Sequence, residues 1–405
     1  MRNWFVALLL VSFLASPAWA KEAPRKKIAK TSPSKSVLPV KAAAKPKSVK
    51  QTPPPEKMVP YKAFIVVEAE TGMVIEGDNV HQKCRPASIT KLMLASIVLD
   101  KLKSGQIKLD DKVTVSPEAA AMGGSQVYLK AGEAFSLDEM MRAVMVASAN
   151  DAAYAVAEFI AGSRNAFVDM MNEKAVKLNM VDSQFHSMHG LPPSKNQEAD
   201  ISSPSDLAIL ARELVQSPQL LVWTSMKTEP FRDGTLIMRN HNNLMNRFSG
   251  MDGLKTGFYR EAGYSIVATA KRNGLRLIAV VMGSSAAKIR DGIVDEKLKK
   301  AFGQYEMVSV IKQGDTVDKD IALPDGKQKT LKPVAASSFS YPLARSKKKL
   351  LTKNLDLPEK VKGEIKQGQR MGEMVISFNN EVVGKVELVS PVNVPKRGFF
   401  SRLFN

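Results

Sequence analysis

The spacing of apolar residues predicts a domain that mixes helices with an antiparallel sheet. Two short apolar runs flank a Glu-Thr-Gly turn and predict a β-hairpin: 63–67 and 73–75. Helical spacing then recurs in segments that begin near Pro86, Ser136, Arg164 and Pro204. Two strong strand patterns follow around an Asn-Gly turn, and a last helix comes after them: 263–270, 275–282 and 289–302. The pattern therefore indicates an α+β fold with a helical cluster and an antiparallel sheet.

The pattern of apolar residues changes near residue 306. Apolar runs become short and β-like, as in 308–310, 373–378 and 382–388, with Gly, Asp and Pro between them and no long helical pattern. We therefore predict a first domain at 58–305 and a small all-β domain at 306–394.

Both ends of the chain differ from these domains. Residues 1–20 have a positive start, an apolar stretch and an Ala-Trp-Ala site, which is typical of a cleaved signal peptide. Residues 21–57 are rich in Lys, Pro and Ala and predict a disordered linker. The tail 395–405 would place its Phe and Leu side chains on one face if helical, and is a candidate membrane anchor. We expect an exported protein, in the periplasm and peripheral on the outer face of the cytoplasmic membrane.

The charge does not indicate a nucleic-acid partner. The formal net charge is +19, but residues 21–57 alone hold eleven Lys or Arg against two Glu. The chain shows no zinc-finger spacing, no aromatic ribonucleoprotein motif and no basic region joined to heptads. Attraction to an anionic lipid or wall polymer fits better. The single cysteine, Cys84, excludes an intramolecular disulfide.

Ser88 and Lys91 form the first candidate catalytic pair. Their spacing puts both side chains on one face of a helical turn, directly after Pro86 and before a run of apolar residues. A serine hydroxyl needs a base beside it to act as a nucleophile, and a lysine qualifies when its pKa is lowered. The same spacing recurs at four other places, so the motif is weak by itself: Ser32/Lys35, Ser285/Lys288, Ser309/Lys312 and Ser346/Lys349.

Two further motifs follow in order along the chain. Ser148-Ala149-Asn150 falls where one helical pattern pauses before the next begins. Lys255-Thr256-Gly257 comes before the strand that starts with Gly263-Tyr264. Motif matches count only in the right structural context, and the three settings agree with one another.

With these three motifs the sequence resembles the serine D-alanyl-D-alanine carboxypeptidases, the low-molecular-mass penicillin-binding proteins. The resemblance spans about residues 60–395 and includes 123–126, 147–152, 252–257 and 262–264. It implies a catalytic domain of the β-lactamase and transpeptidase type, followed by a β-domain. It also implies a peptidoglycan stem peptide as substrate, β-lactams as covalent inhibitors, and no metal or other cofactor.

The resemblance also implies a role for each motif residue. Ser88 would attack the carbonyl between the two terminal D-alanines and Lys91 would accept its proton. Ser148 and Lys255 would relay a proton to the leaving D-alanine, and Asn150 would orient Lys91 and the substrate. Lys255, Thr256 and Gly257 would bind the substrate, with the terminal carboxylate on Lys255 and Thr256. The backbone N–H groups of Ser88 and Phe258 would form the oxyanion hole.

Alternatives remain at this point. A D,D-endopeptidase of peptidoglycan cross-links uses the same chemistry, and a non-enzymatic wall-binding protein would need none of it. A class A β-lactamase requires a Glu-x-x-Leu-Asn loop, which Glu173 and Glu198 do not provide. His186 and His189 suggest a zinc peptidase only weakly, because no Glu or third ligand accompanies them.

Overall fold

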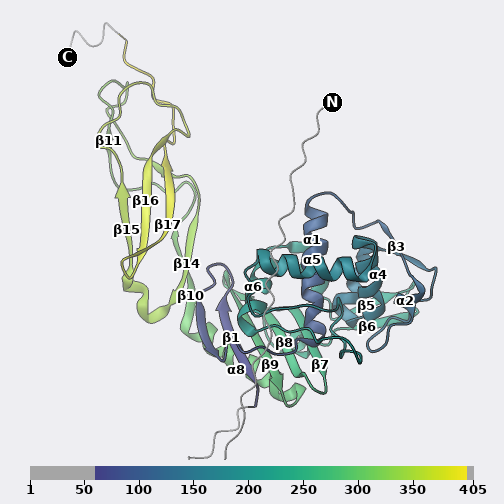
Figure 1. The fold of residues 1–405 in the computed structure, drawn as a ribbon. Coiled ribbons are helices and arrows are strands. Elements are labelled where there is room, and N and C mark those ends of the chain that lie inside the picture. Colours follow the sequence, from purple (N-terminus) through teal and green to yellow (C-terminus); the bar gives the residue numbers. More distant parts are fainter. Residues whose placement is uncertain (1–59, 399–405) are drawn as a thin grey trace, which may run out of the picture. The chain divides into compact units, whose positions relative to one another are not determined.

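The computed structural model describes residues 60–398, so the predicted signal peptide and linker and residues 399–405 of the tail lie outside the description. Five antiparallel strands form the central sheet in the order β2-β1-β9-β8-β7 (Figure 1). Their bounds are β1 Ala63–Glu68, β2 Val74–Asp78, β7 Met251–Tyr259, β8 Gly263–Arg272 and β9 Leu275–Ser284. The predicted hairpins, β1–β2 and β8–β9, are both confirmed.

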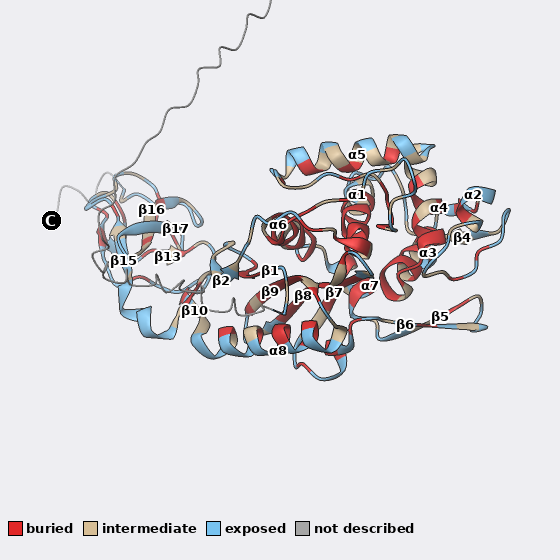
Figure 2. Cartoon of the chain, turned by 60° about the horizontal axis from the view of Figure 1, so that its bottom comes forward, coloured by how far each residue is buried: buried red, intermediate tan, exposed pale blue. Residues whose placement is uncertain are grey.

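Alternate residues of these strands enter two different hydrophobic cores. Ile65 and Val67 of β1 face one core with α1, whereas Phe64 and Val66 face a second core with α8. This alternation follows from the two-residue repeat of a strand, and it makes the sheet the middle layer of the domain. Figure 2 shows α8 on one side of the sheet and the other helices around α1 on the opposite side. The helices of the domain are α1 Lys91–Lys103, α2 Pro117–Ala120, α3 Leu137–Arg142, α4 Asn150–Ala161, α5 Arg164–Lys177, α6 Pro204–Leu214, α7 Pro218–Ser225 and α8 Ala287–Gln304.

Helix α1 is the centre of the larger core, and its first eight residues are buried. The chain enters it through the 3₁₀ turn η1 Ala87–Thr90, directly after Pro86. Ser88 therefore lies in this turn and Lys91 is the first residue of the α-helix, rather than both lying in one α-helix. Side chains three apart share a face in a 3₁₀ turn as well, so the expected juxtaposition is kept.

The predicted helix start at Ser136 and the predicted pause at Ser148 are both present. Ser136 and Glu139 form a reciprocal capping box at the start of α3. The helix continues through the π-helical turn η2 Ala143–Ala147 and then breaks, because Ser148 adopts a left-handed conformation with φ of 61°. Helix α4 begins at Asn150 and ends at Gly162, also left-handed. The break places Ser148 and Asn150 at a helix junction.

The strand pattern after residue 304 forms a separate all-β domain with its own core, as predicted. Its main sheet has the order β13-β17-β16-β15, and β10 pairs with β14. The elements are β10 Tyr305–Ile311, β11 Ile321–Ala322, β12 Thr330–Leu331, β13 Val334–Ala335, β14 Phe339–Ala344, η4 Arg345–Leu350, β15 Leu351–Asp356, β16 Arg370–Phe378 and β17 Glu381–Val389. At its end, Lys396 bridges to Gly326 in extended conformation, so the described part of the tail is not helical.

Several smaller elements were not predicted from the sequence. Helix α7 packs Trp223 into the core, where its indole N–H donates to Asp138 at 2.8 Å. Others are the hairpin of β5 Thr228–Phe231 and β6 Leu236–Arg239, the turn η3 Asn243–Asn246, and β4 Ala134–Ser136, which pairs with the short strand β3 Lys112–Thr114. Within residues 60–398, none of the helices is long and apolar enough to cross a membrane.

The capping box gives a test of the fold. Replacing Ser136 by Ala should lower the free energy of unfolding by about 1 kcal/mol, because the backbone N–H of Glu139 loses its acceptor. Urea unfolding measures this change. Ser194→Ala in an exposed loop is the control and should stay within about 0.5 kcal/mol of the parent. Equal stability of both variants would contradict the assignment of this cap.

Candidate active site

Ser88 and Lys91 are in hydrogen-bond contact. The Lys91 amine lies 3.2 Å from Ser88 Oγ, across the turn that joins η1 to α1. Ser88 is partly exposed and lines a cavity of about 290 Å³, whereas Lys91 is completely buried. The arrangement therefore offers an accessible hydroxyl with an amine directly behind it, which is the geometry of a serine nucleophile and its base.

Two further acceptors hold the Lys91 amine. Asn150 Oδ1, at the start of α4, and the backbone carbonyl of His189 each lie 2.7 Å from Lys91 Nζ. The amide of Asn150 is itself oriented, because its Nδ2 donates to the carbonyl of Gly123 at 2.7 Å. Lys91 is thus held by three segments that are far apart in the sequence: the turn η1 that carries Ser88 (the nucleophile turn), the start of α4, and the loop around residue 189.

Burial makes Lys91 a stronger candidate for the base. The loss of solvation lowers the pKa of Lys91 well below its ordinary value, and the nearby positive charge of Lys255 lowers it further. The carboxylates of Asp200 and Asp151 act in the opposite direction. A lysine with a lowered pKa holds a larger neutral fraction near neutral pH, which is the form that can accept a proton from Ser88.

The second and third motifs line the same cavity from other sides. Ser148 is buried at the break between η2 and α4 and faces the cavity with Ser88. Lys255 is buried on β7, and burial together with the charge of Arg290 lowers its pKa to about 7. Thr256, next along β7, is a lining residue of the cavity. The structure therefore brings all three motifs together.

Gly257 explains how β7 comes so close to the nucleophile. A Cβ at this position would lie 2.3 Å from the carbonyl oxygen of Pro86 and 3.2 Å from the backbone N of Ile89. Only glycine allows this contact between the edge strand and η1. Phe258 follows at the cavity, with 51% of its surface exposed and its ring stacked on Tyr264 at 4.0 Å. Phe258 and Ser88 thus line the same cavity.

Three residues contribute to this site in ways that the sequence did not indicate. Arg290 on α8 is buried, lines the cavity and is held by Asp291 at 2.7 and 2.9 Å. His241 also lines the cavity, and burial and neighbouring cations lower its pKa to about 4. His189 contributes only a backbone carbonyl, so its side chain gives no sequence signal. Arg290 and His241 lie outside the three motifs, and only folding brings them to the cavity.

The histidine pair considered for zinc is engaged in other contacts. His186 Nε2 lies 3.3 Å from Glu198, and His189 Nδ1 accepts from the backbone N–H of Leu191. In the part of the chain that the structure describes, no three His, Cys, Asp or Glu side chains gather in a way that would hold a metal ion.

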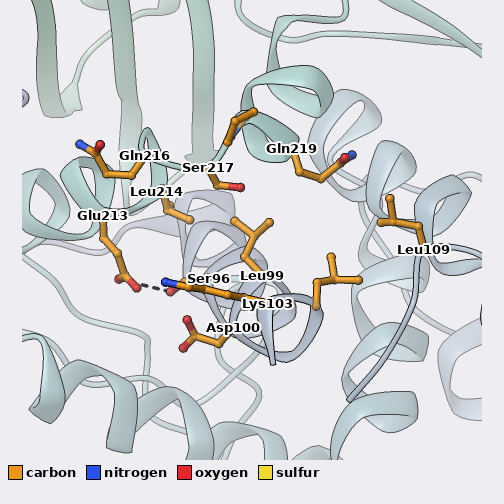
Figure 3. A pocket seen from close by; sticks show the side chains of 12 residues that line it. Ser96, Leu99, Asp100, Lys103, Leu109, Glu213, Leu214, Gln216, Ser217 and Gln219 are labelled. Atoms are coloured by element: carbon orange, nitrogen blue, oxygen red, sulfur yellow. Dashed lines mark hydrogen bonds between the residues drawn. The ribbon is translucent and has the colours of Figure 1, made fainter. Parts of the chain in front are cut away.

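A second cavity of about 670 Å³ lies between the end of α1 and the α6–α7 connection (Figure 3). Apolar side chains such as Leu99 and Leu214 line it, and none of the motif residues does. The carboxylates of Asp100 and Glu213 on its rim already bind Lys174. The chemistry of the site therefore belongs to the smaller cavity.

Comparison with known proteins agrees with this geometry. Residues 48–286 match the family model described as D-alanyl-D-alanine carboxypeptidase. The chain belongs to the D-alanyl-D-alanine carboxypeptidase family. Residues 305–396 match the model of the C-terminal domain of penicillin-binding protein 5. The predicted family, the α+β fold with a C-terminal β-domain, and the expectation of a serine-type hydrolase are thereby confirmed.

Relatives in the family align over most of the chain. The D-alanyl-D-alanine carboxypeptidase DacF of Bacillus subtilis is 34% identical over 347 residues, covering 84% of this chain and 88% of the relative. DacC of Escherichia coli is 31% identical and covers 86% and 87%. Among solved structures, penicillin-binding protein 6B of Escherichia coli aligns with a TM-score of 0.65 and 29% identity, over 84% of this chain and 98% of that one.

Lys255 gives a pH prediction for this carboxypeptidase. If Lys255 binds the carboxylate of the ligand, as the sequence resemblance implies, the second-order rate constant for acylation by benzylpenicillin should fall as the pH rises through about 7, because Lys255 then loses its charge. Lys255→Arg keeps its charge at higher pH and should remove this alkaline limb. Stopped-flow acylation across the pH range measures both profiles.

The matched control is Lys271→Arg, an exposed lysine on β8. Its profile should equal that of the parent enzyme. An alkaline limb near pH 7 that persists in the Lys255→Arg enzyme would contradict the assignment of this limb to Lys255.

Proposed function

We propose that this serine D-alanyl-D-alanine carboxypeptidase removes the terminal D-alanine of peptidoglycan stem pentapeptides through an acyl-enzyme on Ser88. The observation that carries the proposal is the contact of Ser88 Oγ with a buried lysine whose pKa is lowered. Neutral Lys91 accepts the hydroxyl proton as Ser88 Oγ attacks the carbonyl between the two D-alanines. A tetrahedral intermediate forms, with its negative charge on the former carbonyl oxygen.

In this proposal, residues of β7 stabilise the negative charges of the oxyanion and of the substrate carboxylate. The backbone N–H groups of Ser88 and Phe258 stabilise the oxyanion, which only develops in the transition state. The close contact at Gly257 supports this, because it brings the Phe258 backbone beside the nucleophile turn. Lys255 and Thr256 bind the terminal carboxylate of the substrate, and Arg290 adds a second positive charge at the same cavity.

Collapse of the intermediate requires a proton on the departing amine. Ser148, which lines the cavity, and the buried Lys255 relay to this amine the proton that Lys91 took from Ser88, so free D-alanine leaves. Asn150 keeps Lys91 oriented throughout and offers its side chain to the substrate amide. Water then attacks the ester and regenerates Ser88. β-Lactams acylate the same hydroxyl, and their ring opening takes the place of departure of D-alanine.

An endopeptidase acting on cross-links is the second candidate. A D-alanyl-D-alanine endopeptidase of Pseudomonas aeruginosa is 32% identical, but the match covers only 58% of this chain. The carboxypeptidase relatives cover 84% and 86% of it, including the β-domain. The carboxypeptidase therefore has the stronger support, and a non-enzymatic wall-binding role has the weakest.

The location of the enzyme depends on the two ends of the chain, most of which lie outside the described residues. We propose that residues 1–20 direct export, that residues 21–57 act as a linker, and that residues 395–405 contact the membrane surface. The domain limits 58–305 and 306–394 belong to the same proposal. Periplasmic action at the outer face of the cytoplasmic membrane places the enzyme where peptidoglycan is remodelled.

Covalent labelling tests the nucleophile. Incubating residues 21–405 with benzylpenicillin should add one penicilloyl group, detected by intact mass, and Ser88→Ala should abolish the adduct. Ser285→Ala removes the serine of another Ser-x-x-Lys sequence and should label like the parent. A slowly lost adduct agrees with a carboxypeptidase, and rapid turnover would indicate a β-lactamase. Full labelling of the Ser88→Ala protein would overturn the assignment.

Product analysis separates the two peptidase activities. With a purified pentapeptide and a cross-linked dimer at equal concentration, we expect release of free D-alanine to be the faster reaction. Chromatography of the products measures both rates. Faster cleavage of the dimer would make the endopeptidase the main activity while leaving Ser88 as the nucleophile.

A further inference from the structure

Asp200 is a buried carboxylate that the proposed mechanism does not use. Only 6% of its surface is exposed, and it lies in the segment before α6. Four donors converge on it. The backbone N–H groups of His186 and Ser187 donate to Oδ1 at 2.7 and 2.9 Å, and the hydroxyls of Ser187 and Thr90 donate to Oδ2 at 2.8 and 2.9 Å. A buried carboxylate with this many donors is a fixed anchor rather than a surface charge.

One of these donors belongs to the nucleophile turn. Thr90 lies between Ser88 and Lys91, and its buried hydroxyl donates to Asp200 at 2.9 Å. Neither Thr90 nor Asp200 lines the cavity, so Asp200 holds the turn at the residue that joins the nucleophile to the base. This contact fixes the turn without touching the substrate side of the site.

The other donors belong to the loop that holds Lys91. Ser187 Oγ donates to Asp200 and accepts from the backbone N–H of Gly190 at 2.9 Å, which closes the turn 187–190. The His189 carbonyl within this turn lies 2.7 Å from Lys91 Nζ. A Cβ on Gly190 would lie 2.0 Å from the carbonyl oxygen of Ala87, so the loop packs directly on the nucleophile turn.

We propose that Asp200 is a positioning residue of this enzyme: one carboxylate joins Thr90 to the 186–190 loop and so holds Ser88 and Lys91 in register for proton transfer. The proposal rests on the assignment of Ser88 and Lys91 above. A displacement of about 1 Å between a nucleophile and its base costs about 10²-fold in rate. Asp200 prevents such a displacement from two sides at once.

Asp200 also affects Lys91 through its charge. It raises the pKa of Lys91, as Asp151 on α4 does, while burial and Lys255 on β7 lower it. The loop residue His189 and His241 both have lowered pKa values, about 3 and about 4, and are neutral near pH 7. Removing the charge of Asp200 therefore lowers the pKa of Lys91, an effect that a purely structural anchor would not have.

Four variants separate these effects by the rate of acylation with benzylpenicillin. Asp200→Ala removes all four acceptor contacts and should slow acylation about 10²-fold. Thr90→Val removes one contact and should slow it less, and Thr90→Ser should restore the parent rate. The double variant Asp200→Ala/Thr90→Val should be no slower than Asp200→Ala alone, because the two residues act through one contact.

The pH profile gives the readout specific to Lys91. Asp200→Asn keeps the shape of the side chain and should move the acid limb of the acylation profile to lower pH, since less alkaline solution then suffices to deprotonate Lys91. Asp206→Asn is the matched control. This buried aspartate accepts hydrogen bonds from the backbone N–H of Asp182 and the hydroxyl of Ser183, and not from Thr90 or Ser187. Its rate per folded molecule and its acid limb should equal those of the parent.

The outcomes distinguish this proposal from the one it rests on. If the parent enzyme is not acylated at Ser88, the proposed function fails and the role of Asp200 fails with it. If the parent is acylated, parent-like rates in folded Thr90→Val and Asp200→Asn, with an unmoved acid limb, would overturn the role of Asp200 alone. Circular dichroism checks the folding of each variant. If Asp200→Ala does not fold, Thr90→Val and Asp200→Asn still decide the test.

Discussion

The burial of one lysine is the constraint on which the rest of this site depends. A buried amine is costly unless polar partners surround it, and Lys91 meets Ser88 Oγ, Asn150 Oδ1 and the His189 carbonyl within 3.2 Å. These partners come from a turn, a helix start and a loop. Each must be placed accurately for the amine to remain buried, so the demand for a reactive base also dictates the local fold.

The fold meets this demand at backbone contacts that need glycine. Gly257 lets the edge strand β7 contact the turn at Pro86 and Ile89, and Gly190 lets the 187–190 loop contact the same turn at Ala87 and Ser88. Between these contacts, η1 has little freedom to move. The nucleophile is therefore set by packing of backbone on backbone, which is stiffer than contact through long side chains.

The electrostatic balance of the site uses charges of both signs. Burial and the charge of Arg290 lower the pKa of Lys255 to about 7, while Asp200 and Asp151 limit how far the pKa of Lys91 falls. A site with cations alone would bind the carboxylate of its substrate and leave Lys91 a weak base. The β-domain contributes none of the residues named in this balance, and its core is separate.

The local parts of this protein could be read from the sequence. The Ser88 and Lys91 spacing, the capping box at Ser136 and the hairpin turn near Asn273 are set by neighbours within a few residues, and all are present. Which distant residues complete the site depends on the three-dimensional fold. Arg290, the His189 carbonyl and Asp200 have no spacing relation to the motifs, because the folding of the sheet and loops brings them there.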